Sequence, residues 1–449
     1  MPTLTEMDQQ IAARRQDFEA AIRSGVEIPT VSMDPDRRGD IRRGAEWAAG
    51  LLRDFGAEAR IVETPGHPVV HGRLATPGAK RSLAIYNHLD VQPANEPEWR
   101  SDPFKLVVDG ERYIGRGATD DKGPALTALF AAAMAREAGV PLDIHFFWEF
   151  EEEIGSPHFE TFLQSAPRVD SVLVSDTIWI SRGKPAAPLG LRGMQTVRLV
   201  LRTGTNDAHS GLTGGPARNP VAEMCDLVAA LCDAHTGEVK IPGFYDEVRQ
   251  TTAEEIEGFL ASGFDPKEFQ RVHGFRSLRY TEAADITRRI WALPTLEVHG
   301  IAGGYQGPGV KSVIPPWAEA KLSMRLVPDM TPQRALARLT SFVVAANPDV
   351  EIHAEAALEP YLAPSGGPYV AALERAMSEG FGAEPAFVRE GGSIGAVVQM
   401  QRALGCPVMF LGLSLPEHGY HAPNEFFDWQ MAAGGMKAFL AYFREVAAL

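Results

Sequence analysis

Between residues 8 and 176 the chain alternates short apolar runs with helix-like segments, and this alternation limits the fold more than any other feature. The runs at 82–90, 142–150 and 169–176 have the length and apolar content of buried strands. Helix-like segments lie at 8–24, 40–55 and 123–139. This order favours an α/β fold in which a mostly parallel sheet is flanked by helices.

The residue pattern changes near residue 185, in the Pro/Gly-rich stretch GKPAAPLGLRG. After it, segments at 194–204, 295–304 and 318–328 alternate like half-exposed antiparallel strands, and helix-like segments lie between them. The 449 residues are also too many for one ordinary domain. We therefore expect a catalytic domain split into residues 1–187 and 363–449, with an α+β lid or dimerisation domain inserted at 188–362.

Composition excludes several classes of protein. The formal net charge of −15 argues against a nucleic-acid binder, which needs a basic face. No uninterrupted apolar run reaches the about 18 residues that a membrane span requires. The three cysteines provide no disulfide framework, and the first residues resemble a charged amphipathic helix instead of a signal peptide. We expect a cytoplasmic protein that binds neither nucleic acid nor membranes.

Imidazole and carboxylate groups follow the predicted strands where each strand ends. They are His88, Asp90, Asp120, Asp121, Glu151, Glu152, Glu153, Asp176, His418 and His421. Taken singly, such a histidine is usually structural and a run of glutamates is usually a solvated surface. Together, at the carboxyl ends of parallel strands, they offer the ligands of a hard or borderline divalent metal. A bridging carboxylate flanked on each side by a histidine and a carboxylate would hold two ions about 3.5–4 Å apart.

Short motifs in a fixed order extend this pattern over most of the chain. They are HLDVQP, GRGATDDKGP, EEIGS, VSDTIW, GLRG, DAHSGLTGG, KSVIP, MRLVPDM, REGGSI and HAPNE. In these motifs and their order the chain resembles the M20 family of co-catalytic metallopeptidases, which includes aminoacylases, deacylases, carboxypeptidases and dipeptidases. It is most similar to the branch of cytosolic nonspecific dipeptidases and carnosinases.

The resemblance implies a set of metal ligands. It comprises His88, Asp120, Glu153, Asp176 and His421, with Asp120 bridging two divalent ions, zinc or manganese, with cobalt also open. It also implies a cis peptide between Asp120 and Asp121.

Two further residues would act beside these ligands. Asp90 follows His88 by two positions, so both point the same way from a strand, and Asp90 would fix the tautomer of that imidazole. Glu152 would be the general base that activates the metal-bridging water.

On the substrate side, the resemblance assigns roles to residues in three other motifs. His209 would reach into the active site of the partner subunit and stabilise the oxyanion, which implies a homodimer. Arg325 would bind the carboxylate of the substrate, and Ser312 occupies the place of a family threonine. Gly392 and Ser393 resemble a loop that lines the pocket. For His418 two readings stay open, a place beside the metal ligands or a place on the surface.

The expected reaction is two-metal hydrolysis of an amide bond next to a free carboxylate, in dipeptides or short peptides. An alternative substrate is an N-acyl or N-carbamoyl amino acid, or a xenobiotic amide. The alternative stays open because LAPSGGPYVAAL lacks a histidine found in mammalian-type dipeptidases, and REGGSIG lacks the usual proline. A non-catalytic binding protein on this fold is disfavoured, since no ligand and no base is missing from the sequence.

Overall fold

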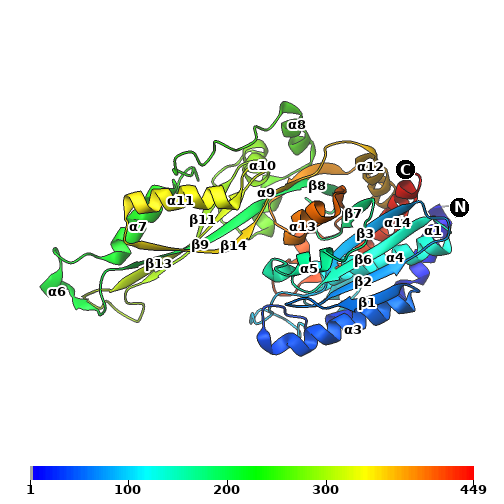
Figure 1. Cartoon of the computed structure of the whole chain (residues 1–449), viewed down its shortest axis with the longest axis horizontal. Coiled ribbons are helices and arrows are strands. Elements are labelled where there is room, and N and C mark those ends of the chain that lie inside the picture. Colours follow the sequence, from blue (N-terminus) through cyan, green and yellow to red (C-terminus); the bar gives the residue numbers. More distant parts are fainter. Residues whose placement is uncertain (1–3) are drawn as a thin grey trace.

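The computed structural model describes residues 4–449 and has two lobes (Figure 1). The lobe that we call the terminal lobe contains the first described residues and the C-terminus, which lie near each other, and a sheet of six strands. The lobe that we call the middle lobe contains an antiparallel sheet of four strands, β11, β13, β9 and β14. None of the described helices combines the length and the apolar character needed to cross a membrane.

The sheet of the terminal lobe has the strand order β1-β2-β6-β3-β7-β17. Its strands are β1 (Glu58–Val62), β2 (Val69–Leu74), β3 (Arg81–His88), β6 (Leu142–Glu149), β7 (Ser171–Val174) and β17 (Val408–Phe410). Strands β6, β3, β7 and β17 run parallel, whereas β1 and β2 are antiparallel to their neighbours. The prediction of a mostly parallel sheet is confirmed.

Helices cover both faces of this sheet, which explains the continuous apolar runs in its strands. The main ones are α3 (Arg38–Asp54), α4 (Gly123–Glu137), α5 (Phe159–Leu163), α12 (Pro368–Phe381), α13 (Gly395–Leu404) and α14 (Trp429–Ala447). Along β3, Leu83 and Ile85 join one apolar core, and Ala84 and Tyr86 join another on the opposite face. The helix expected at 8–24 is two helices, α1 (Leu4–Ala13) and α2 (Arg15–Val26), which meet at Arg14.

The middle lobe has its own apolar core. Its sheet consists of β9 (Gly193–Arg202), β11 (Thr295–Gly303), β13 (Trp317–Leu326) and β14 (Val350–Leu358). Helices α7 (Pro220–Leu231) and α11 (Pro332–Ala346) pack on it, each beginning at a side-chain cap followed by proline. At the far tip of this lobe lies α6 (Ser210–Thr213), next to β10 (Ala208–His209) and β12 (Val313–Ile314) (Figure 1).

Several elements connect the two lobes. Strand β8 (Ala186–Leu191) spans the expected boundary at residue 187 and pairs with β15 (Tyr361–Leu362) and β16 (Ala386–Glu390). Helices α8 (Ala253–Ala261), α9 (Pro266–Val272) and α10 (Ala283–Trp291) belong to the segment expected to be inserted. Yet Phe259 and Trp291 share the apolar core of the six-stranded sheet. The division at 187 and 362 stays a prediction.

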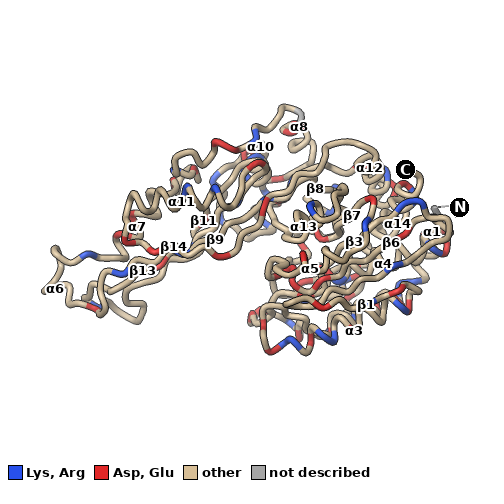
Figure 2. The backbone as a smooth tube through the Cα atoms, in the orientation of Figure 1, with Lys and Arg blue, Asp and Glu red and all other residues tan. Residues whose placement is uncertain are grey.

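A small sheet and short helices carry the loops near the ends of β3 and β6. The sheet consists of β4 (Val107–Asp109), β5 (Arg112–Ile114) and β18 (Phe426–Asp428), and the short helices are η1 (Pro35–Arg37), η2 (Ala118–Lys122), η3 (Glu152–Ile154) and η4 (Pro416–His418). Acidic residues gather in the region next to α5 (Figure 2), whereas basic and acidic residues are interspersed along α3.

Candidate metal centre

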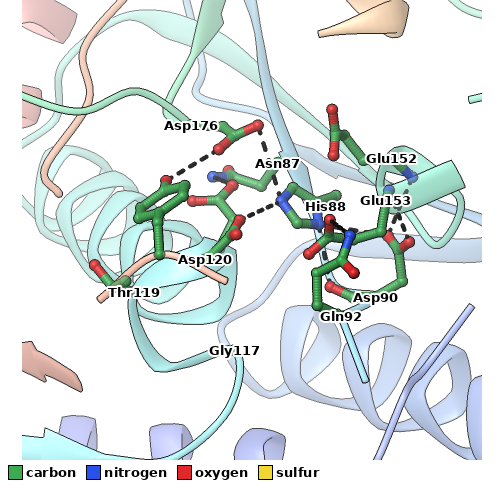
Figure 3. A network of polar contacts seen from close by, with 12 residues as sticks. Asn87, His88, Asp90, Gln92, Gly117, Thr119, Asp120, Glu152, Glu153 and Asp176 are labelled. Atoms are coloured by element: carbon green, nitrogen blue, oxygen red, sulfur yellow. Dashed lines mark hydrogen bonds and ion pairs between the residues drawn. The ribbon is translucent and has the colours of Figure 1, made fainter. Parts of the chain in front are cut away.

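His88 is the last residue of β3 and is fully buried. Its Nε2 lies 2.9 Å from Oδ1 of Asp120 and 3.8 Å from Oδ2 of Asp176. Its Nδ1 lies 3.1 Å from the backbone oxygen of Asp90 and 3.4 Å from Oδ1 of the same residue. In Figure 3 the imidazole lies between Asp120 on one side and Asp90 on the other. One ring nitrogen thus faces carboxylates while the other is held by Asp90.

The carboxylate of Asp90 also forms two hydrogen bonds that the sequence did not predict. Its Oδ1 accepts the backbone N–H of Glu152 at 3.2 Å, and its Oδ2 accepts the backbone N–H of Glu153 at 3.1 Å. These two glutamates begin the turn after β6. Asp90 therefore fixes the position of that turn as well as the orientation of His88.

Asp120 lies between two imidazoles. Its Oδ1 faces His88, and its Oδ2 lies 3.0 Å from Nε2 of His421. The same Nε2 lies 3.2 Å from Oε2 of Glu153. The peptide bond between Asp120 and Asp121 is cis, as predicted. Each oxygen of Asp120 thus faces a different histidine, which is the geometry of a bridging ligand.

On the other side of His88, Asp176 follows β7 by two positions. Its Oδ1 accepts a hydrogen bond of 3.2 Å from the hydroxyl of Tyr420. Asp121 accepts a hydrogen bond of 2.7 Å from Nδ2 of Asn87. Donor atoms of His88, Asp121 and Asp176 lie within 4.8 Å of one another, and so do those of His88, Asp120 and Glu153. Either group could hold an ion, and the two groups share His88.

The electrostatics of this cluster fit cations. Burial raises the pKa of Asp176 to about 6, a shift that His88 opposes and the carboxylates of Asp120 and Glu153 increase. Burial also raises the pKa of Glu153 and, well above its usual range, that of Glu152. Buried carboxylates that repel one another gain from a shared divalent ion. The donors are carboxylate oxygens and imidazole nitrogens, which suit zinc, manganese or cobalt.

Two residues support the loop that carries Asp120: Glu425, which the sequence analysis did not assign to the site, and His418, for which it left two readings open. Glu425 accepts the backbone N–H groups of Thr119 at 2.9 Å and of Asp120 at 3.1 Å. His418 is fully buried, and its Nδ1 lies 2.9 Å from Oγ1 of Thr119. Of the two readings of His418, the structure therefore favours a place beside the ligands. The signal for Glu425 was present, because it closes the HAPNE motif.

A cavity of about 800 Å³ lies over the cluster. Asp120, Glu152, Glu153, Asp176 and His421 line it together with the predicted substrate residues Arg325, Gly392 and Ser393. Nη1 of Arg325, on β13 of the middle lobe, donates a hydrogen bond of 3.1 Å to Oγ of Ser393. The structure thus brings a guanidinium and the candidate ligands to one cavity.

His209 and Ser312 lie elsewhere. Both belong to the tip of the middle lobe, where the backbone N–H of Ser210 donates to the backbone oxygen of Ser312 at 3.0 Å. His209 is exposed and accepts the backbone N–H of Gly211 at its Nδ1, which caps α6. Neither residue lines the cavity of its own chain. In Figure 1 the tip with α6 is the end of the molecule remote from the six-stranded sheet.

Comparison with known proteins gives a consistent result. A model of peptidase family M20/M25/M40 matches residues 84–445. The chain is 30% identical to the Beta-Ala-His dipeptidase of Rattus norvegicus, over 100% of this chain and 96% of that protein. It is 29% identical to the Cys-Gly metallodipeptidase dug1 of Schizosaccharomyces pombe, over 100% of this chain and 99% of that protein. The crystal structure of human carnosine dipeptidase 1 superposes with a TM-score of 0.88 at 30% identity, and each chain is covered over 100% of its length.

Proposed function

The chain belongs to peptidase family M20/M25/M40 and is a hydrolytic enzyme, and from this premise we propose that it cleaves dipeptides or short peptides at an amide bond next to a free carboxylate. One observation carries the proposal. Asp120 faces His88 with one oxygen and His421 with the other, and Arg325 lines the same cavity. A candidate dinuclear centre and a candidate binding group for a carboxylate therefore line one cavity.

We assign the ligands as follows. His88 and Asp176 would hold one divalent ion, Glu153 and His421 would hold the other, and Asp120 would bind both. The ions are zinc or manganese, with cobalt as a further candidate. When bound, two such ions polarise a carbonyl and lower the pKa of a water molecule, which is the chemistry that amide hydrolysis needs.

Glu152 is the proposed general base. Its side chain lines the cavity beside Glu153, and Asp90 fixes its backbone N–H. Burial raises the pKa of its carboxyl group, a setting in which a carboxylate can gain and release a proton near neutral pH. Glu152 accepts the proton of the attacking water and returns it to the leaving amine.

Arg325 is the proposed binding group for the substrate carboxylate. The guanidinium of Arg325 forms no ion pair among the described residues, and burial lowers its pKa. A planar guanidinium can bind a carboxylate through two parallel hydrogen bonds. Ser393, which already accepts from Arg325, and Gly392 line the cavity beside it. This arrangement favours substrates whose scissile amide lies one residue from a free carboxylate.

His209 and Ser312 are proposed to act in trans within a homodimer. Both lie at the tip of the middle lobe and outside the cavity of their own chain, so a role at the reaction centre requires a partner subunit. There the imidazole of His209 would donate to the oxyanion of the tetrahedral intermediate.

The same centre could hydrolyse N-acyl or N-carbamoyl amino acids, and one experiment separates the candidates. Metal-stripped protein is given Zn²⁺ or Mn²⁺ and tested on dipeptides, including β-Ala-His and Cys-Gly, and on N-acetyl amino acids. Metal-dependent cleavage of free dipeptides is the expected result. Turnover of N-acetyl amino acids alone would move the function to an amidohydrolase, and no hydrolysis with either ion would contradict the proposal.

A further inference from the structure

The two candidate carboxylate ligands that do not bridge, Glu153 and Asp176, each accept a hydrogen bond from a neutral side chain beside the cluster. Nε2 of Gln92 donates to Oε2 of Glu153 at 2.7 Å, and the hydroxyl of Tyr420 donates to Oδ1 of Asp176 at 3.2 Å. In Figure 3, Gln92 and Glu153 lie on one side of His88 and Asp176 lies on the other. Both sides of the cluster thus pair one carboxylate with one neutral donor.

Gln92 lies on the segment that leaves β3, two positions after Asp90. Asp90 accepts the backbone N–H of Glu153 at 3.1 Å, and Gln92 donates to the carboxylate of the same residue. The oxygen that Gln92 contacts also lies 3.2 Å from Nε2 of His421. One short segment therefore holds both the backbone and the side chain of Glu153. It directs the carboxylate towards the histidine with which Glu153 is proposed to share an ion.

Tyr420 supports the other carboxylate from the last part of the chain. It directly precedes His421 and lines the catalytic cavity. Its hydroxyl contacts Oδ1 of Asp176, whereas Oδ2 of Asp176 lies 3.8 Å from Nε2 of His88. The oxygen that the hydroxyl leaves free is thus the one that faces the histidine with which Asp176 is proposed to share an ion.

A hydrogen bond to one oxygen of a carboxylate ligand has two physical consequences. It restricts rotation of the side chain, so less rotational entropy is lost when an ion binds. It also favours binding through the other oxygen alone, which leaves positions on the ion for water and substrate. An amide and a phenol can do this without competing with the ion, because neither carries a positive charge.

We propose that Gln92 and Tyr420 are positioning residues of the metal centre. Gln92 fixes the carboxylate of Glu153 and Tyr420 fixes that of Asp176, so each positions a ligand of a different ion. This inference rests on the ligand set of the proposed function and deepens it by assigning a separate support to each ion.

The first test measures metal affinity. Metal-stripped Gln92→Leu and Tyr420→Phe proteins, which lack one donor each, are titrated with Zn²⁺ in competition with a chelating indicator. Wild type should bind two ions, and each variant should hold one of them about 10- to 100-fold less tightly. The matched controls are Tyr280→Phe, which removes a hydroxyl that donates to the backbone of Thr236 away from the cavity, and Gln401→Leu, at an exposed position of α13. Both controls should bind zinc like wild type.

A second readout reports the coordination of the ion directly. When the donor is removed, the freed carboxylate can bind Co²⁺ through both oxygens and raise its coordination number. Because Co²⁺ absorbs visible light more weakly at higher coordination number, the absorption per bound ion should fall in Gln92→Leu and Tyr420→Phe and stay unchanged in the controls. A contact that only stabilised the fold would leave this spectrum as in wild type.

A second substitution assigns each donor to its ion. In Asp176→Asn protein, Gln92→Leu should lower the affinity of the remaining ion by about 10- to 100-fold, and Tyr420→Phe should leave it unchanged. In Glu153→Gln protein the two effects should be exchanged. If Gln92→Leu and Tyr420→Phe weaken the same ion, the separate assignment is wrong.

Failure of this inference differs from failure of the proposed function. If wild type binds two ions and both donor variants match its zinc affinities and its Co²⁺ spectrum, the positioning roles are wrong and the proposed function stands. If wild type binds two ions, responds to the variants as expected and yet hydrolyses neither dipeptides nor N-acetyl amino acids, the proposed function is wrong and the positioning roles stand. If wild type binds neither Zn²⁺ nor Mn²⁺, the ligand set itself is wrong and both fail.

Discussion

The backbone N–H of Asp120 donates a hydrogen bond of 3.1 Å to Oε1 of Glu425, a residue 305 positions further along the chain. The other oxygen of Glu425 accepts the N–H of Gly117 at 3.0 Å and lies 2.9 Å from Nη1 of the buried Arg116. Glu425 therefore ties the loop that carries the candidate bridging ligand to the last part of the chain.

We expect Glu425→Gln to weaken both stability and metal binding. The substitution removes the nearer and fully buried of the two carboxylates that face the guanidinium of Arg116, leaving Glu96 at 3.8 Å, and should lower the free energy of unfolding by about 3 kcal/mol. The loosened loop should weaken metal affinity by about 10- to 100-fold. Urea unfolding and competition with a chelating indicator measure the two effects.

A matched control for this variant is Glu46→Gln, which removes an exposed partner of Arg42 on α3. Exposed ion pairs contribute little, so its free energy of unfolding should stay within about 0.5 kcal/mol of wild type. Equal effects of the two substitutions would contradict the positioning role of Glu425.

The part of the site that the sequence predicted depends on local rules. Asp90 follows His88, the last residue of β3, by two positions, and residues with that spacing on extended backbone point the same way. Asp176 follows β7, and Asp120 precedes α4, both at the same edge of the parallel sheet. Such groups converge because the carboxyl ends of parallel strands share an edge. The ligand cluster could therefore be found without a structure, once the motifs were recognised.

What the sequence did not predict depends on contacts between distant segments. The bond between Glu425 and Asp120 joins residues on different elements, and no periodicity encodes such a pairing. Likewise, Phe259 and Trp291 lie in the segment expected to be inserted, yet they pack into the core of the terminal lobe. Apolar helices carry no local signal for which of two cores they join.

Asp176 should destabilise the metal-free protein at neutral pH. Its folded pKa of about 6 lies above the ordinary value of 3.8, so the folded state binds a proton that the unfolded chain releases between these values. The resulting stability is present below about pH 4 and is lost as the pH rises through 6. Asp176→Asn keeps a neutral side chain at every pH. In the presence of a chelator it should therefore raise the free energy of unfolding at pH 8 by about 1–3 kcal/mol, with no gain at pH 4.

Urea unfolding of the chelated protein at pH 4, 6 and 8 checks this prediction. Asp226→Asn, at an exposed position of α7, is the control and should show no such pH-dependent gain. With metal present, wild type should be more stable than Asp176→Asn, because the variant lacks a proposed ligand and gains little stability from added Zn²⁺ or Mn²⁺. A variant as strongly stabilised by metal as wild type would show that Asp176 is not a ligand.

Replacing Glu152 should separate catalysis from metal binding. Glu152→Gln keeps the size of the side chain and removes the proton acceptor, so kcat should fall by about 10²- to 10⁴-fold. Metal content, measured by elemental analysis of the purified protein, should equal that of wild type because the five proposed ligands are intact. Glu151→Gln is the control at the neighbouring position. The Glu151 carboxylate does not line the cavity; it accepts a hydrogen bond from the backbone N–H of His67 and contacts His158. Normal turnover by Glu152→Gln would rule out its role as the base.

Mixed dimers test whether His209 acts across a subunit interface. His209→Ala and Glu152→Gln homodimers should each be nearly inactive, the first for lack of an oxyanion donor and the second for lack of a base. In a heterodimer of the two variants, one active site receives both an intact Glu152 from its own chain and an intact His209 from the partner. Co-expression with two affinity tags and sequential purification isolates this species, whose activity should reach about half that of wild type if the two sites work independently.

If His209 served its own chain, one site of the heterodimer would lack the base and the other the donor. The heterodimer would then be as inactive as the two homodimers.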